Sequence, residues 1–162
     1  MATKVEGRER LLAKMRALPV EVRSAIKQAL AQGADEITDM QKRLAPVSAT
    51  GSHGNPPGAL RDSIVQTWGG DKARYSSLAG SAGAGDPDLT VRISAGNSKV
   101  RYAHLVEFGT SPHPNGGKFK GTDHPGTTAQ PFFYPAYRAL RKRVKSRISR
   151  ATNKAAKKVA GK

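Results

Sequence analysis

The chain of 162 residues carries 28 Lys and Arg against 12 Asp and Glu, a formal net charge of +16, and it contains no cysteine. The lack of cysteine excludes disulfide bridges and thiolate metal sites, and the positive charge predicts an acidic partner, either nucleic acid or a protein surface. No apolar run is long enough to cross a membrane, and no charged-then-apolar leader resembles a signal peptide. Because only 37% of the residues are hydrophobic and 6% aromatic, we expect helices that bury part of their apolar surface against other subunits.

Two N-terminal helices are predicted from apolar residues that recur at helical spacing. The first covers residues 5–18 and forms most of an N-terminal extension, residues 1–19. The second spans roughly residues 20–45 and ends before Pro46, because the residue before a proline disfavours helical geometry. Gly33 occupies a position in the apolar stripe of the second helix, where Gly costs about 1 kcal/mol relative to Ala. It therefore predicts that another helix approaches closely there.

The middle of the chain predicts loops that alternate with short strands. Residues 46–59 are rich in Gly, Pro and Ser and predict a flexible loop. Residues 60–68 favour a strand, since they include β-branched residues and Trp. A Gly/Ala/Ser/Asp loop covers residues 69–87, and residues 89–94 alternate between apolar and polar, which is the clearest strand signal in the chain.

The sequence contains no convergent set of acid, base, nucleophile and metal ligands, so we expect no enzymatic activity and no cofactor. Four histidines lack paired spacing and predict no metal site; they are His53, His104, His113 and His124. Three aspartates lie in or beside the second loop without the ordered pattern of a calcium loop, and they are predicted to be surface acids; they are Asp71, Asp86 and Asp88.

Two short segments, residues 102–110 and 131–136, hold five of the eight Phe and Tyr residues. The first predicts one or two helical turns that end at Gly109. The second is an apolar arm from which Pro135 leads into a long helix, and a polar loop, residues 111–130, separates the two segments. Large aromatic side chains dominate the energetics of interfaces. The candidates for a subunit interface are Tyr102, Glu107, Phe108, Phe132, Phe133 and Tyr134.

Alternatives remain open for these candidates. Each aromatic side chain could close the core of its own subunit instead of contacting a neighbour. The carboxylate of Glu107 could pair with Arg61 or Arg101, and a solvated carboxylate is equally compatible with the sequence.

A long C-terminal helix is predicted from apolar residues at steps of three or four between Tyr137 and Val159. Residues 138–162 hold 11 of the 28 basic residues and no acidic one. Like charges along one helix repel each other, so we expect a negative partner, either DNA or an acidic protein surface, and we favour the protein surface. The candidate contacts are Arg138, Arg141, Lys142, Arg143, Lys145, Arg147 and Arg150.

These elements together predict an α+β fold, in which a small antiparallel β-sheet is packed by N-terminal helices and a long basic C-terminal helix. The expected organisation is the extension of residues 1–19, an α+β domain of residues 20–145 and a basic helical tail of residues 146–162. From charge alone, a basic nucleic-acid-binding protein is an alternative reading.

An ordered set of motifs resembles a bacteriophage family. The motifs are Ala45-Pro46-Val47, Thr50-Gly51, Leu60-Arg61-Asp62-Ser63-Ile64, the segment Tyr102 to Thr110, and Pro131-Phe132-Phe133-Tyr134-Pro135-Ala136. Over roughly residues 20–145 they resemble the tail-completion or head–tail joining proteins of long-tailed siphophages, the gene-product-ten-like family of lambdoid phages. The insertion from Ser52 to Ala59 departs from the family pattern.

The resemblance implies a structural protein of the virion neck without a catalytic role. Such a protein would form a ring, a tail terminator or tail completion of six subunits, that joins the head connector to the tail tube. Its partners would be further copies of itself, the neighbouring neck and tail-tube proteins, and DNA in the channel. The ring would be assembled in the host cytoplasm and would remain in the virion.

Overall fold

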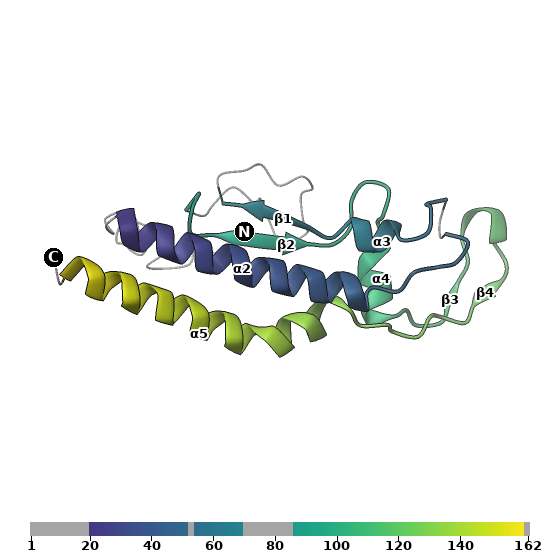
Figure 1. Ribbon diagram of the computed structural model, residues 1–162. Helices are drawn as coiled ribbons and strands as arrows, with labels where there is room; N and C mark the ends of the chain where they lie inside the picture. Colours follow the sequence, from purple (N-terminus) through teal and green to yellow (C-terminus); the bar gives the residue numbers. More distant parts are fainter. Residues whose placement is uncertain (1–19, 52–53, 70–85, 161–162) are drawn as a thin grey trace, which may run out of the picture. The chain divides into compact units, whose positions relative to one another are not determined.

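The computed structural model describes residues 20–51, 54–69 and 86–160, which form helices and short two-stranded sheets (Figure 1). This is the α+β class that the sequence predicts. The chain divides into two units. Unit 1 contains Met1–Glu36, Gln66–Ile93 and Leu140–Lys162, and unit 2 contains Ile37–Val65 and Ser94–Ala139. The predicted helix of residues 5–18 lies outside the described residues.

Two long helices, α2 (Val20–Leu44) and α5 (Phe133–Ala160), each contribute residues to both units. Helix α2 confirms the predicted helix of residues 20–45. Glu21 lies in its first turn, and Lys42 and Arg43 lie in its last turn, where each charge complements the helix dipole. Neither helix has the apolar length that a membrane crossing requires, and the same holds for the other helices in the described part of the chain.

In unit 1, α2 and α5 run side by side in opposite directions (Figure 1). A Cβ atom added at Gly33 would lie 2.5 Å from Cγ1 of Val144, so only glycine allows the two backbones to approach this closely. The close helix contact predicted from Gly33 is therefore confirmed. Buried Val22, Ala29 and Leu89 form part of the core of unit 1.

A two-stranded sheet of β1 (Val65–Trp68) and β2 (Val91–Ser94) belongs mainly to unit 1. Next to the paired strands, the backbone N–H of Gly69 donates to the carbonyl of Thr90 at 2.9 Å. The side chain of Gln66 donates to Oδ1 of Asp35 at 3.0 Å and so links β1 to α2. The strand predicted for residues 89–94 is thus confirmed from its third residue onward.

Asp86, at the start of the segment that leads into β2, is buried, with 1% of the residue exposed. Arg23 donates from Nη2 to both carboxylate oxygens, at 2.8 and 3.0 Å, and the backbone N–H groups of Asp88 and Leu89 donate to Oδ1. Burial alone would raise the pKa of Asp86, but these hydrogen bonds and the charge of Arg23 outweigh it and lower that pKa. The prediction of a surface acid is therefore wrong for Asp86.

The other two aspartates of that prediction have different outcomes. The side chain of Asp88 is 46% exposed and pairs with Nζ of Lys27 at 2.7 Å, as a surface acid does. Asp71 lies outside the described residues.

In unit 2, residues 59–62 form the short helix α3 (Ala59–Asp62), so the strand predicted for residues 60–68 is wrong in its first part. Gly58, with a φ of 82°, precedes the helix in a left-handed conformation that favours glycine. The hydroxyl of Ser63 donates to the carbonyl of Leu60 at 2.6 Å and closes the turn. Buried Leu60 and Ile64 are four residues apart, a spacing that places both side chains on one face of a helical turn and equally on one face of a strand.

Helix α4 (Ala103–Phe108) follows the predicted helical turns, and Gly109 ends it with a φ of 72°. The predicted polar loop of residues 111–130 is wrong in one respect, because it contains a hairpin. Strands β3 (His113–Pro114) and β4 (Asp123–His124) pair in antiparallel register around the 3₁₀ turn η1 (Gly117–Phe119). Two-residue strands are too short to show an alternating pattern in the sequence.

Candidate interaction surfaces

The start of α5 is held by the carboxylate of Glu107, which projects from α4. Oε2 accepts hydrogen bonds from the backbone N–H groups of Phe132 and Phe133, both at 2.8 Å, and Oε1 accepts one from Tyr134 at 3.0 Å. Pro135, next in the chain, has no N–H to satisfy. A carboxylate at this position accepts hydrogen bonds from backbone N–H groups that have no partner within the helix, and its negative charge complements the helix dipole.

This arrangement differs from both alternatives that the sequence left open for Glu107. Its side chain is 6% exposed, so neither a solvated carboxylate nor a pair with Arg61 or Arg101 describes it. Pro135 already marks the start of the long helix in the sequence, but no sequence signal shows that Glu107, 25 residues before Phe132, caps it.

The three adjacent aromatic residues of the arm differ in burial. Phe132 is 1% exposed and belongs to the core of unit 2, Phe133 is half-buried, and Tyr134 is 47% exposed. Neighbouring rings meet edge to face, with centroids 6.2 Å apart for Phe132 and Phe133 and 5.7 Å apart for Phe133 and Tyr134. Phe132 therefore anchors the arm within its own subunit, and Tyr134 remains available at the surface.

Exposed apolar side chains from α4 and α5 form one patch in unit 2. Phe108 is 66% exposed, and its ring centroid lies 5.9 Å from that of Tyr134. Leu105 is one turn before Phe108, and Tyr137 is one turn after Tyr134, and both are also exposed. We call these four residues, Leu105, Phe108, Tyr134 and Tyr137, the aromatic patch. Contiguous exposed aromatics of this kind mark protein-contact surfaces.

A groove of about 590 Å³ lies beside the aromatic patch in unit 2. Tyr102, Leu105 and Val106 of α4 line one part of it, and the loop from Pro46 to Ser48 lines another. Tyr102, one of the interface candidates, is partly exposed here. Leu105 belongs to both the groove and the patch, so the two features form a continuous surface.

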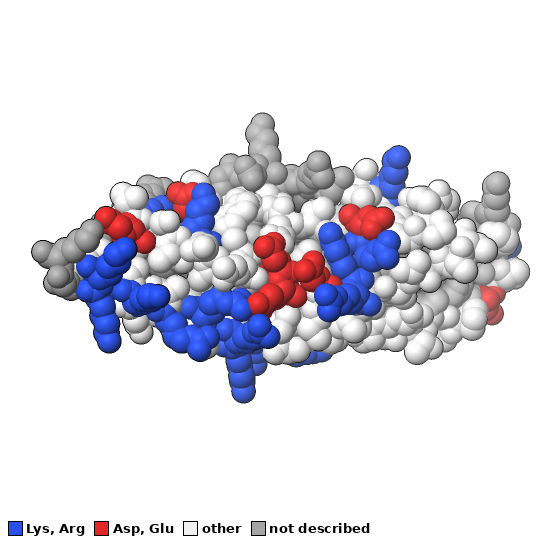
Figure 2. Space-filling view, viewed as in Figure 1, with Lys and Arg blue, Asp and Glu red and all other residues white. Residues whose placement is uncertain are grey.

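The solvent-facing sides of α5 beyond Tyr137 are covered by cations. Figure 2 shows Lys and Arg side chains gathered along α5 on the face in view. Six of the seven predicted contact residues are exposed; they are Arg138, Arg141, Lys142, Arg143, Lys145 and Arg150. Lys154, Lys157 and Lys158 continue the exposed cations toward the end of the helix.

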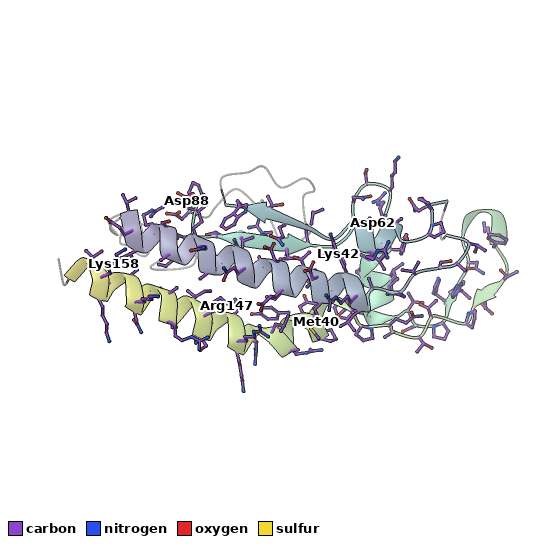
Figure 3. The ribbon with its side chains drawn as sticks, in the orientation of Figure 1. Met40, Lys42, Asp62, Asp88, Arg147 and Lys158 are labelled. Carbon is purple, nitrogen blue, oxygen red and sulfur yellow. The ribbon has the colours of Figure 1, made fainter. Side chains whose placement is uncertain are left out.

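Arg147 is the exception, because it lies on the side of α5 that faces α2 (Figure 3). Its Nη2 donates to Oε1 of Glu36 at 2.5 Å, and Nη2 of Arg143 approaches the same oxygen at 3.4 Å. The hydrogen bond from Arg147, with the nearby positive charges, lowers the pKa of Glu36 although partial burial opposes this. Arg147 therefore joins the two helices in unit 1 and is withdrawn from the outer basic surface.

The histidines of the hairpin stack on each other and do not gather further ligands. The rings of His113 and His124 lie 4.9 Å apart at an angle of 15°. Nδ1 of His113 donates to the carbonyl of Ser111, and Nδ1 of His124 accepts from the N–H of Gly126. Within residues 20–51, 54–69 and 86–160, no group of three or more His, Cys, Asp or Glu side chains could hold a metal ion.

Comparison with protein families identifies a family model that matches this chain. The family model described as "Bacteriophage HK97-gp10, putative tail-component" matches residues 9–109, which include α2, both strands of the first sheet and α4. Comparison with curated proteins and with solved structures gives no match.

Proposed function

The chain belongs to the HK97-gp10-like family of bacteriophage tail components, and on this premise we propose that it forms a ring at the junction between head and tail. In this proposal, copies of the chain associate into a closed ring of six, a tail terminator or tail-completion ring that joins the head connector to the tail tube. The role is structural, and the protein catalyses no reaction. Assembly takes place in the host cytoplasm, and the ring stays in the neck of the virion.

The aromatic patch is the observation that carries this proposal. A protein that acts alone gains nothing from exposing two rings in contact, Phe108 and Tyr134, beside exposed Leu105 and Tyr137. Interface cores are enriched in Tyr and Phe, and a few such residues usually supply most of the binding energy. Ring closure needs a heterologous contact, in which the patch of one subunit meets a different surface of the next.

Light scattering and negative-stain microscopy of the purified protein test the proposal. We expect closed rings and a mass several times that of one chain at micromolar concentration. The double variant Phe108→Ser/Tyr134→Ser should fall to a lower mass, because each change removes apolar area from the contact. Its far-UV circular dichroism should match that of the wild type, since both side chains are exposed.

Phe119→Ser is the matched control, because Phe119 is 70% exposed but lies on η1, apart from the aromatic patch. This control should keep the wild-type mass. A strictly monomeric wild-type protein at high concentration, with no ring in assembled particles, would refute the ring.

A further inference from the structure

We propose that the outer face of α5 in unit 1 binds the phosphate backbone of double-stranded DNA without reading its sequence. Seven exposed cations form this face, which we call the basic face; they are Arg141, Lys142, Lys145, Arg150, Lys154, Lys157 and Lys158. Among the described residues, no ion pair is recorded for any of them, whereas Arg143 and Arg147 pair with Glu36. No acidic residue follows Asp123 in the chain. The positive charge of the basic face is therefore not neutralised along its own helix.

The spacing of the cations suits a regular polyanion. From Arg141 to Lys158 the helix rises about 25 Å at about 1.5 Å per residue. One strand of DNA presents about seven phosphates over that length. Arg150, Lys154 and Lys157 follow steps of four and three, which places them on one side of the helix, while Arg141 and Lys145 lie on the other flank. Cations on both flanks can reach the two strands that border one groove.

The lack of apolar anchors on the basic face distinguishes DNA from an acidic protein. The large exposed hydrophobic side chains of α5 are Tyr134 and Tyr137, and the described helix has none beyond them. Protein interfaces have apolar cores in which charged residues are depleted, so a surface of cations separated only by Ser, Asn and Ala is a poor protein contact. Phosphate contacts require cations alone. The described surface thus favours DNA over the acidic protein that sequence analysis favoured.

The absence of aromatic residues selects duplex over single-stranded DNA. Proteins that hold single strands combine cations with aromatic rings on which the bases stack. No Phe, Tyr or Trp follows Tyr137 in the sequence. The basic face can therefore contact a backbone but cannot stack on bases.

Fluorescence anisotropy of the full-length protein with a labelled mixed-sequence 30-bp duplex tests this inference. We expect affinity that falls steeply with salt, since each neutralised phosphate contributes about −0.9 to the slope of log K against log[salt]. The variant Arg141→Gln/Lys145→Gln/Arg150→Gln/Lys154→Gln should reduce the magnitude of that slope by about 3–4 and weaken binding at least tenfold at low salt.

A matched control removes four exposed cations of unit 2 instead; it is Arg43→Gln/Lys99→Gln/Arg101→Gln/Lys120→Gln. Both variants lose the same net charge, so equal losses of affinity would overturn the assignment to α5. No binding of the duplex at low salt would overturn it as well. So would tighter binding of a single strand of the same sequence, or of poly-glutamate at the same concentration of charges. Light scattering of the same samples reports the ring separately, so failure of DNA binding and failure of assembly are distinguishable.

Discussion

The aromatic patch of unit 2 and the basic face of unit 1 both include residues of α5 but differ in chemistry. Near its start, α5 exposes Tyr134 and Tyr137 and carries the core residue Phe132 just before it. Beyond Tyr137 it exposes cations and only small or polar side chains between them. One helix thus presents a surface suited to protein contacts and a second surface suited to phosphate. Residues 138–162, which include the basic face, hold 11 basic residues and no acidic one, so most of the net charge of +16 comes from this part of the chain.

The two surfaces are also fixed by different means. In unit 2, a buried carboxylate and a buried ring position the aromatic patch, through the hydrogen bonds of Glu107 and the burial of Phe132. In unit 1, close packing at Gly33 and the pair of Glu36 with Arg147 hold α5 against α2. Substitutions in each set should therefore affect one surface and leave the other intact.

The largest expected effect comes from Phe132→Ala. Truncation of a buried Phe removes its packing and leaves a cavity, and it should lower the free energy of unfolding by about 3–5 kcal/mol. Tyr134→Ala, two residues on, should cost less than Phe132→Ala, because Tyr134 is half-exposed and each of its two ring pairs is worth only about 0.5–1.5 kcal/mol, but it should weaken assembly. Urea unfolding and light scattering measure the two effects. If Phe132→Ala were as stable as Tyr134→Ala, the division between core and surface residues in the arm would be wrong.

A smaller loss is expected for Glu107→Gln. The amide keeps one acceptor oxygen, but its NH₂ group cannot accept from the remaining backbone donors, so the variant should lose about 1–3 kcal/mol of unfolding free energy. Glu21→Gln, which changes an exposed acid in the first turn of α2, serves as the control and should cost less than about 1 kcal/mol. Equal stability of Glu107→Gln and the wild type in urea would contradict the capping role.

Gly33→Ala tests the helix contact in unit 1. Alanine should gain about 1 kcal/mol of helix propensity, but overpacking costs about 1–3 kcal/mol. Because the new Cβ would lie 2.5 Å from Cγ1 of Val144, we expect a net loss of about 1 kcal/mol in urea unfolding. In a Val144→Ala background the contacts with Cγ1 and Cγ2 are removed and the nearest remaining atom is Cβ of residue 144 at 3.3 Å, so the same substitution should cost less there than in the wild type. A stabilising effect in both backgrounds would show that the helices are not in close contact.

The smallest effect concerns pH and Asp86. Its pKa in the folded protein lies below the ordinary value of 3.8, so the pair with Arg23 contributes stability above pH 3.8 that is lost as the pH falls through the folded pKa. Asp86→Asn should therefore be less stable than the wild type at pH 6, and the difference should shrink below pH 3.8. Thermal unfolding between pH 2.5 and 6 measures this, and a constant difference across that range would exclude the ion pair as its source.

The sequence predicted those parts of the fold that depend on local pattern. The bounds of α2 follow from its apolar stripe and Pro46, and the close approach at Gly33 follows from a glycine in that stripe. The early helical turn of α3 could not be predicted, because Leu60 and Ile64 fit a strand as well as a helix until the contact of Ser63 is known. Strands β3 and β4 are too short for any periodicity.

The interaction surfaces were predicted in part. The sequence identified Phe108 and Tyr134 as candidates, but it could not separate them from Phe132, since burial depends on which side of the arm faces the core. The sequence named Glu107 as an interface candidate but did not predict that it caps α5, and it did not predict the buried pair of Asp86 with Arg23. Each depends on residues more than 20 positions apart, and no spacing rule in the sequence connects them.

The central claim, that the two surfaces have separate roles, is tested most directly by one crossed measurement. The mass by light scattering and the duplex affinity by anisotropy are recorded for the wild type, for Phe108→Ser/Tyr134→Ser, and for Arg141→Gln/Lys145→Gln/Arg150→Gln/Lys154→Gln. We predict that the first variant loses the ring. Its affinity for a short duplex, expressed per subunit, should keep the wild-type slope of log K against log[salt]. The second should keep the ring and lose duplex affinity. If either variant lost both properties while remaining folded, the two surfaces would act as one, and the account would be contradicted.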